Sequence, residues 1–290
     1  MTFEKRTHIV PIGFEIDRVV EPILEDNASI VYLITNNEVI KGDEKRGKYC
    51  LDHVKMALDK RINEVQVVNM GNKSDFFNFY KLMSEICYLV RKEKEIKGNK
   101  VFINISAGST ISGIVGTLVA QSYEVDAYYT EPDKYTEGYG KDCKFFIDNT
   151  CTFYETDSKH RCLPLTTGMK DNVLLPLFGI IPPEDDQLHA LKIISEFPAG
   201  TTQENIIIRL IEENLGSQAD KDDLSMQGFT DKLRSRFRRK FFNKLMEEGL
   251  IERLGSKRNP KWAITPDGKT HLELFWKAAE YVIKNKNIKH

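Results

Sequence analysis

Short apolar runs alternate with amphipathic segments over the first half of the chain. The runs are almost continuous in apolar residues, as in strands that are covered on both faces. They predict strands at residues 6–12, 30–34, 64–70, 101–105 and 125–130. The segments between them have apolar residues at helical spacing. These segments predict helices at residues 14–25, 46–61, 74–97 and 111–121. The alternation predicts an α/β fold, a Rossmann-like and mostly parallel sheet with helices on both faces.

The last hundred residues follow another pattern. Helices are expected at residues 185–196, 201–215 and 230–248, with a polar loop at 216–227. Two short strands, 249–254 and 260–265, flank a basic turn, and a final helix follows. This is the order of a C-terminal winged helix-turn-helix domain. We therefore expect three parts: a ligand-sensing domain at 1–156 that includes a β-like segment at 144–156, a linker region at 157–183, and a DNA-binding domain at 184–290.

Composition narrows the class of protein. The chain has 290 residues, of which 41% are hydrophobic and 29% charged. No apolar run approaches the ~20 residues of a membrane span, and the N-terminus lacks a signal-peptide pattern. The five cysteines are scattered without C-x-x-C spacing, which argues against a zinc site or a disulfide framework. We expect a cytoplasmic protein with no membrane partner, no metal and no cofactor.

Two loops at predicted strand ends carry the candidate chemistry. The stretch Asn104–Thr110, N-I-S-A-G-S-T, joins a strand to a small-residue helix. Such a turn gathers backbone N–H groups at the positive end of a helix dipole, where phosphate binds. The alternative is an ordinary helix cap. The other loop follows the first strand, and its Phe14 could face a bound ligand or the core. The candidate ligand-binding residues are Gly13, Phe14, Asn104, Ser106, Gly108, Ser109 and Thr110.

Small residues line one side of the helix after the second loop. They are Ser109, Ser112, Gly113, Gly116 and Ala120. Glycine inside a helix costs about 1 kcal/mol relative to alanine, so something must pack closely there. Packing on the sheet of the same subunit and packing across a two-fold axis both remain open.

Basic residues concentrate near the end of the chain. Residues 232–261 hold eleven Lys or Arg and three Glu, a net charge of +8, while the whole chain carries −1. A basic helix face beside a basic turn is typical of DNA binding, and a solvated charged surface is the alternative. Arg234 and Arg238 fall toward the apolar side, so the helix breaks there or they pair with acids. The predicted DNA-binding residues are Lys232, Arg236, Arg239, Lys240, Asn243, Lys257, Arg258 and Lys261.

These features together resemble the CRISPR-associated Rossmann-fold (CARF) regulators. The resemblance rests on Ile12-Gly13-Phe14, on the N-x-S-x-G-S-T turn and on the order of the domains. It implies a homodimer that takes part in CRISPR antiviral defence. Its sensor domains would bind a cyclic oligoadenylate, with cyclic tetra-adenylate as first choice, and its winged helices would bind double-stranded DNA and regulate transcription. A symmetric ring suits an interface in which both subunits supply the same loop.

Three other functions were weighed against this one. A dinucleotide-dependent enzyme is disfavoured because no G-x-G-x-x-G follows the first strand and no acid follows the second before Glu38. A metal-independent ring nuclease would use Ser106, Ser109 and Thr110 to position the ring. That motif contains no histidine as general base, and His8 lies inside a strand. A HEPN-type effector nuclease is disfavoured because the C-terminal domain contains no R-x4–6-H motif.

Overall fold

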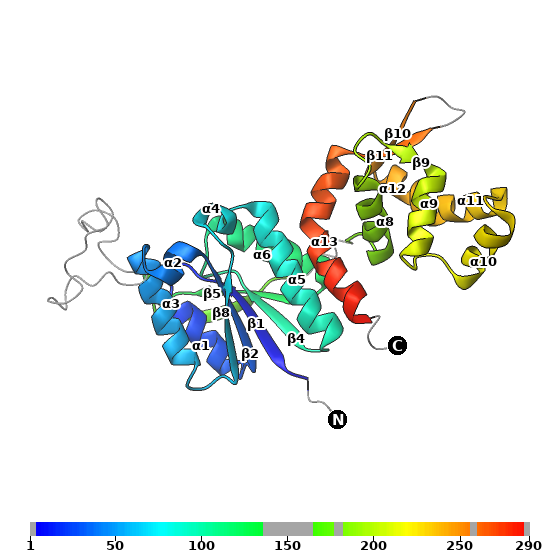
Figure 1. Ribbon diagram of the computed structural model, residues 1–290. Helices are drawn as coiled ribbons and strands as arrows, with labels where there is room; N and C mark the ends of the chain where they lie inside the picture. Colours follow the sequence, from blue (N-terminus) through cyan, green and yellow to red (C-terminus); the bar gives the residue numbers. More distant parts are fainter. Residues whose placement is uncertain (1–3, 136–164, 177–181, 256–259, 287–290) are drawn as a thin grey trace. The chain divides into compact units, whose positions relative to one another are not determined.

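The computed structural model describes residues 4–135, 165–176, 182–255 and 260–286. The chain divides into two compact units, Met1–Ile181 and Pro182–His290 (Figure 1). The β-like segment expected at 144–156 lies outside the described residues. Each unit has its own core, so each is described by itself.

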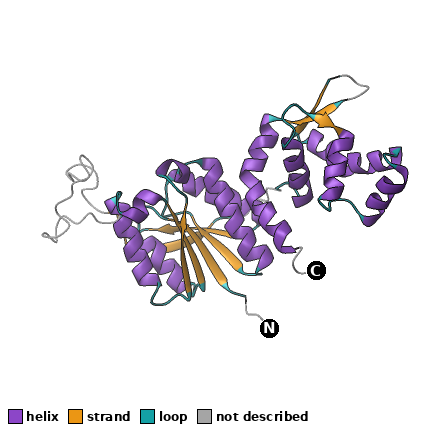
Figure 2. Ribbon diagram, viewed as in Figure 1, coloured by secondary structure: helices purple, strands orange, loops and turns teal. Residues whose placement is uncertain are grey.

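The first unit is built on a six-stranded sheet of order β3-β2-β1-β4-β5-β8. Its parallel strands are β1 (Arg6–Pro11), β2 (Ile30–Thr35), β3 (Glu64–Asn69), β4 (Lys100–Asn104) and β5 (Asp126–Glu131). All five were expected from their apolar runs. Helices lie on both faces of this sheet (Figure 2). The predicted α/β, Rossmann-like fold is therefore confirmed.

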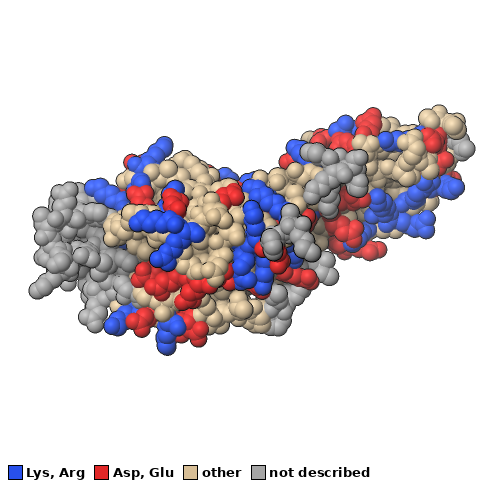
Figure 3. Space-filling model, turned by 90° about the horizontal axis from the view of Figure 1, so that it is seen from below, with Lys and Arg blue, Asp and Glu red and all other residues tan. Residues whose placement is uncertain are grey.

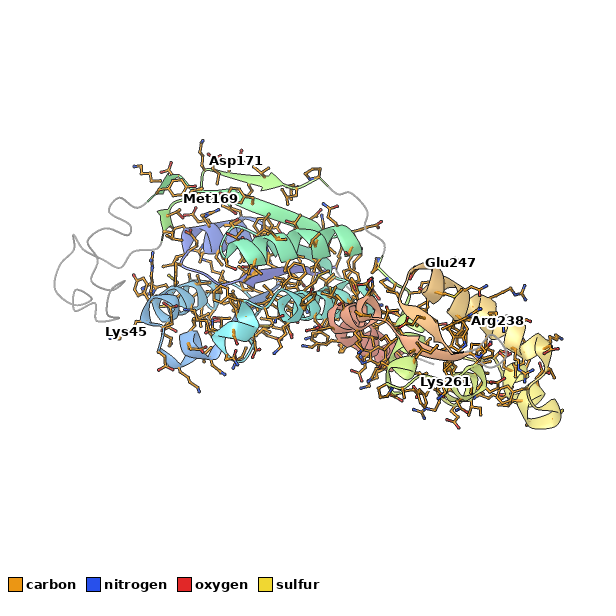
Figure 4. The ribbon with its side chains drawn as sticks, turned by 90° about the horizontal axis from the view of Figure 1, so that it is seen from above. Lys45, Met169, Asp171, Arg238, Glu247 and Lys261 are labelled. Carbon is orange, nitrogen blue, oxygen red and sulfur yellow. The ribbon has the colours of Figure 1, made fainter. Side chains whose placement is uncertain are left out.

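The sheet has one antiparallel strand, β8 (Asp171–Leu174), which pairs with β5. Its start at Asp171 is labelled at the outer edge of the sheet in Figure 4. A small antiparallel pair, β6 (Lys134–Tyr135) and β7 (Thr166–Thr167), lies beside it in the sequence. Both β7 and β8 fall in residues 157–183, where a linker was expected. The strand β8 was missed because none of its four residues is buried and because its two polar residues are followed by two apolar ones instead of alternating with them.

The helices of the first unit follow the predicted order with shifted ends. They are α1 (Asp17–Glu25), α2 (Asn37–Lys41), α3 (Lys45–Leu58), α4 (Lys73–Phe76), α5 (Phe79–Arg91), the π-helical turn η1 (Lys92–Ile96) and α6 (Thr110–Tyr123). The prediction of one helix at 74–97 was wrong. Asn72 caps α4, and Asn78 starts a second helix because its side chain accepts from Lys81 N at 3.0 Å. Residues 14–16 precede α1 rather than belonging to it.

Glycines in α6 allow it to lie close to β4. A Cβ atom at Gly116 would fall 2.9 Å from a methyl carbon of Ile105 and 3.1 Å from one of Ile103. A Cβ at Gly113 would lie 3.4 Å from the carbonyl oxygen of Ile105, an ordinary contact. Close packing within the subunit therefore accounts for Gly116.

The second unit combines helices with a three-stranded antiparallel sheet of order β10-β11-β9. Its elements are α8 (Asp185–Ser195), β9 (Thr201–Thr202), α9 (Gln203–Glu212), α10 (Gln218–Gln227), α11 (Asp231–Phe237), the π-helical turn η3 (Arg238–Phe242), α12 (Asn243–Glu247), β10 (Ile251–Leu254), β11 (Lys261–Ile264) and α13 (Pro266–Lys286). Apolar side chains from α8, α9, α11, η3 and the sheet form its core, with Phe241 and Trp262 almost fully buried. Apart from α10 and β9, these elements were expected in this order. The winged helix-turn-helix assignment itself stays a prediction.

The segment 216–227, expected to be a polar loop, contains α10. Ser217 and Asp220 form a capping box at its start, with Asp220 accepting from Ser217 N at 2.7 Å. This helix was missed because it has almost no apolar side, Leu224 being its main contact with the core. Its stability comes from the cap and from ion pairs, which periodicity does not detect.

The expected helix at 230–248 is continuous but contains an irregular turn. Thr230 caps α11 by accepting from Leu233 N at 3.1 Å, and α11 runs through η3 into α12. A π-helical turn closes i→i+5 hydrogen bonds and so holds one residue more than an α-helical turn. Leu233, Phe237, Phe241 and Leu245 all reach the core despite this irregularity.

Candidate functional site

The two predicted loops meet at the carboxyl edge of the sheet, between β1 and β4. The strand order reverses at this point, which is where ligands bind in open α/β sheets. A Cβ atom at Gly13 would lie 2.1 Å from the carbonyl oxygen of Ala107. Gly108 is also confined, because its Cβ would fall 2.3 Å from the Ser112 hydroxyl oxygen and 3.1 Å from the Pro11 side chain. The loops therefore touch at Gly13 and the Ala107 backbone, and each loop needs its glycine.

Asn104 and Ser106 hold the second loop from inside. The Asn104 amide donates to the backbone oxygen of Arg18 at 2.9 Å and accepts from Ser106 N at 2.8 Å. The hydroxyl of Ser106 accepts from Thr130 N on β5 at 2.6 Å. Both side chains are buried, so they shape the site and connect the ends of β4 and β5 to helix α1.

Ser109 and Thr110 occupy the first turn of α6 with different exposures. Ser109 is the cap residue: its hydroxyl accepts from Ser112 N at 3.2 Å and bonds the Ser112 hydroxyl at 2.9 Å. Ser109 therefore acts as an ordinary helix cap. Thr110 is exposed, and the backbone N–H groups of Thr110 and Ile111 have no acceptor within the helix because of their position. This turn offers an anion one hydroxyl and a helix amino end.

Phe14 lies in the first loop, half-buried. The Arg46 guanidinium, from the first turn of α3, sits 4.6 Å from the centroid of its ring. The carbonyl oxygen of Phe14 accepts from Leu165 N at 2.9 Å. The Phe14 ring is thus neither buried in the core beside α1 nor fully exposed to solvent.

Two buried charged residues next to this loop were missed by sequence reasoning. Arg18 donates from Nε to the oxygen of Thr130 at 2.7 Å and pairs through Nη1 with Glu15 at 3.2 Å. Its Nη2 is buried without an acceptor. Glu15 also accepts from the Thr166 hydroxyl, and burial raises the pKa of Glu15 although Thr166 and Arg18 oppose the shift. Their i,i+3 spacing just after the first strand was the available signal.

A chain of hydrogen bonds crosses the core from Tyr128 to Asp26. The Tyr128 hydroxyl lies 2.9 Å from His8 Nδ1, while His8 Nε2 lies 2.9 Å from a carboxylate oxygen of Asp26. Because the carboxylate can only accept, Nε2 donates to it and Nδ1 accepts from Tyr128. Burial lowers the pKa of His8 although Asp26 opposes the shift. His8 is thus a buried, hydrogen-bonded histidine of the core.

Basic residues of the second unit fall into two groups. In one group each residue is paired with an acid from another element: Arg234 with Glu204, Arg236 with Asp220 and Asp223, Lys240 with Asp186, and Lys244 with Glu184. The expected acid partner of Arg234 is therefore present. Arg238 bonds Gln203 instead, at 3.1 Å.

The other group is exposed and has no acid partner among the described residues. Of the predicted DNA-binding residues it contains Lys232, Arg239 and Lys261, the last on β11 (Figure 4). Arg238 and Arg253 are exposed without an acid partner too, but Arg238 bonds Gln203 and the Arg253 guanidinium lies 4.8 Å from the centroid of the Trp262 ring. Asn243 is half-buried, and Lys257 and Arg258 lie outside the described residues. Figure 3 shows Lys and Arg side chains gathered on one part of the second unit, next to a group of acidic side chains.

No group of three or more His, Cys, Asp or Glu residues in the described part of the chain could hold a metal ion. Within the same residues, none of the helices combines the length and the apolar character that crossing a bilayer requires.

The fold and these loops define a Rossmann-like domain with a candidate ligand site at its switch point. A family model described as HFX_2341_N:-like, N-terminal, matches residues 6–135, the stretch from β1 to β6. An uncharacterized protein of Methanocaldococcus jannaschii, MJ1513, is 29% identical over 195 residues, covering 64% of this chain and 55% of the relative. The chain thus spans about half the length of the curated relative it matches.

Two solved structures with low identity are also similar. Enterococcus italicus Csm6, bound to cyclic hexa-2'-fluoro-hexa-dAMP, is 11% identical with a TM-score of 0.41, covering 85% of this chain and 56% of that chain. Can2 from Sulfobacillus thermosulfidooxidans, in complex with cyclic tetra-adenylate, is 10% identical with a TM-score of 0.34, covering 96% and 66%. Since one fold hosts many functions, such scores do not define a ligand for this chain.

Proposed function

We propose that the protein is a CARF-type regulator: its first unit binds a cyclic oligoadenylate as a homodimer, and its second unit binds duplex DNA as a winged helix. The observation that carries the sensor part is the backbone contact between Gly13 and Ala107. It places the loop after β1 directly beside the amino end of α6.

The chemistry of this edge suits a phosphodiester. The first turn of α6 supplies N–H groups and the exposed Thr110 hydroxyl, and the helix dipole favours negative charge there. Neighbouring residues are small, so a ring of several phosphates can approach the backbone. Ile114, one turn further along α6, is a large apolar residue with 51% of its surface exposed. An exposed apolar position beside the site fits a second subunit across a two-fold axis.

The DNA-binding part rests on the second unit. Its three-stranded antiparallel sheet, the helix α11–α12 and the basic residues on that helix and on β11 match what a winged helix uses. The ligand would change DNA affinity by favouring one arrangement of the dimer over another, which requires different ligand affinity in the two arrangements.

A thermal-shift screen tests the sensor. Cyclic tri-, tetra- and hexa-adenylate are compared with AMP, ATP and NAD. A melting temperature raised by one cyclic ring and by none of the other nucleotides supports the proposal, and stabilisation by NAD alone would replace it with the dinucleotide function. Thr110→Leu should remove the shift without changing the melting temperature of the free protein, since Thr110 is exposed.

The matched control is Gln218→Leu, which is also neutral, exposed and the first residue of a helix, but lies in the second unit. It should leave the ligand shift intact. Chromatography of the nucleotide after incubation separates a sensor from a ring nuclease, because a sensor returns the intact ring. Sedimentation equilibrium tests the dimer, and a monomer at every concentration would refute the shared site.

A further inference from the structure

The basic residues of α11, η3 and α12 divide into two sets with different tasks. We infer that Lys232, Arg239 and Lys261 are the side chains that contact DNA phosphates, whereas Arg236 and its paired neighbours tie this helix to α8, α9 and α10. The inference rests on the proposed DNA binding of the second unit and says which of its cations reach the duplex.

Arg236 is the clearest internal tie. Its guanidinium pairs with Asp220 and, at 3.0 Å, with Asp223, both on α10. The Asp220 side chain is only 6% exposed. Its other oxygen accepts from the backbone N and the hydroxyl of Ser217, each at 2.7 Å. Arg236 therefore completes the capping box of α10, and a phosphate could recruit it only by leaving a buried carboxylate without its partner.

The other paired cations act in the same way on neighbouring helices. Lys240 bonds Asp186 at 3.0 Å and the backbone oxygen of Leu215 at 3.3 Å. Lys244 bonds Glu184 at 3.0 Å, and Arg234 bonds Glu204 at 3.0 Å. The acids come from α8 and α9. Because these pairs are more exposed than the Arg236 pair, each is individually weaker.

Two of the exposed cations, Lys232 and Arg239, lie on one strip of the helix surface. Residues seven apart on a regular α-helix lie within about 20° of one another around the axis, and because the π-helical turn begins only at Arg238, Lys232 and Arg239 still share a side. Ser235 lies between them and is also exposed. On β11, Lys261 is exposed opposite Leu254. These side chains have no acid partner among the described residues, and a row of phosphates is the partner that a strip of cations with a hydroxyl fits.

The test compares Arg239→Gln with Arg236→Gln, which remove the same charge from the same helix. Both are made in the full chain. Binding to a labelled DNA duplex of mixed sequence is followed by fluorescence anisotropy from 50 to 200 mM salt, and melting is followed by circular dichroism. Each phosphate contact contributes about 0.9 to the slope of log affinity against log salt, or about a threefold change over this range.

Arg239→Gln should lower the salt slope by about one and leave the melting temperature unchanged. Arg236→Gln should lower the melting temperature and leave the slope unchanged at temperatures where the protein is folded. The inference would be overturned if Arg236→Gln lowered the salt slope without changing the melting temperature. It would also be overturned if Arg239→Gln left the salt slope unchanged.

Asp220→Asn keeps the test decisive even if Arg236→Gln does not fold. If Arg236 is an internal tie, Asp220→Asn lowers the melting temperature without tightening DNA binding. If Arg236 contacts DNA, removing its acid partner raises affinity and steepens the slope, which contradicts the inference. Wild-type protein that shows no salt-dependent DNA binding at all would instead refute the proposed function of the second unit.

Discussion

The carboxyl edge of the first unit and the basic helix of the second unit both carry polar groups suited to anions, but they use them differently. At the sheet edge the buried polar groups are neutral. Asn104 donates a hydrogen bond to the backbone oxygen of Arg18, and Ser106 accepts one from the backbone N–H of Thr130. On the basic helix the paired groups are charged, and the Arg236 guanidinium forms ion pairs with two carboxylates, those of Asp220 and Asp223. In each region another residue of similar chemistry, Thr110 or Arg239, is exposed.

A sequence motif does not distinguish where an anion could bind from which of the groups there are free to bind it, and the structure does. Residue type marks where an anion could bind, since hydroxyls, amides and cations gather there. Exposure and partners decide which of those groups are available. An inward amide costs stability when it is removed, because its partners are left without hydrogen bonds. An outward hydroxyl or cation changes binding and leaves stability almost unchanged.

The largest effect is expected at the contact between the two loops. Gly13→Val should destabilise the first unit by about 3 kcal/mol through overpacking, because its Cβ would overlap the Ala107 oxygen. Urea unfolding measures the change. Gly113→Ala is the control: its Cβ meets only an ordinary contact, so the protein should be as stable as wild type or more stable. Unchanged stability of Gly13→Val would show that the loops are not in contact.

A somewhat smaller effect is expected from the inward amide. Asn104→Ala should cost about 2 kcal/mol, since the oxygen of Arg18 and the N–H of Ser106 lose buried partners. Thr110→Ala should cost less than about 0.5 kcal/mol. Chemical denaturation of both variants gives the comparison. Equal losses of unfolding free energy would mean that Asn104 is not held by buried hydrogen bonds while Thr110 is free of them.

The pH dependence of stability probes the hydrogen bonds that join Tyr128, His8 and Asp26. Burial lowers the pKa of His8 in the folded protein, so the unfolded chain takes up this proton first as the pH falls. Stability should therefore be complete above the unfolded histidine pKa of about 6.5 and decline below it. Glu15 acts in the opposite direction, because burial raises its pKa.

His8→Gln isolates the histidine contribution, since Glu15 is common to both proteins. Unfolding free energies of wild type and variant, measured between pH 7 and pH 5, should differ less as the pH falls. A difference that stays constant over this range would show that His8 does not titrate differently in the folded and unfolded states.

The smallest effect is expected at an exposed pair of the second unit. Asp186→Asn removes the acid partner of Lys240, whose side chain is 51% exposed. Stability should change by less than about 0.5 kcal/mol. The salt slope of DNA binding should stay the same, because Lys240 lies off the exposed strip and still bonds Leu215 O. A slope steeper by about one would move Lys240 into the DNA-facing set.

The apolar runs were enough to predict the five parallel strands and the two glycine-bearing loops between which the site lies. Periodicity failed where stability has another source. It missed β8, whose residues lack alternation, and α10, which relies on a cap and ion pairs. It also missed the break before α5, because Asn78 interrupts an apolar pattern that otherwise continues.

The division of the candidate residues could not be predicted at all. Arg236 and Arg239 have the same chemistry on the same helix, and what separates them is Asp220, sixteen residues earlier, in a segment expected to be a loop. Likewise, Ser109 and Thr110 both carry hydroxyl groups, and Ser109 is the cap only because α6 begins at Thr110.

The π-helical turn at Arg238–Phe242 has a consequence for how this surface could have arisen and could be altered. Such a turn is what remains when one extra amino acid enters a helix whose two ends are already fixed by packing. Deleting one residue there would restore regular winding and rotate everything before it by about 100°. Leu245 would keep its place, but Lys232 would turn to another side and Leu233 and Phe237 would leave the core, so the extra residue is what allows both halves of the helix to contribute to one interior.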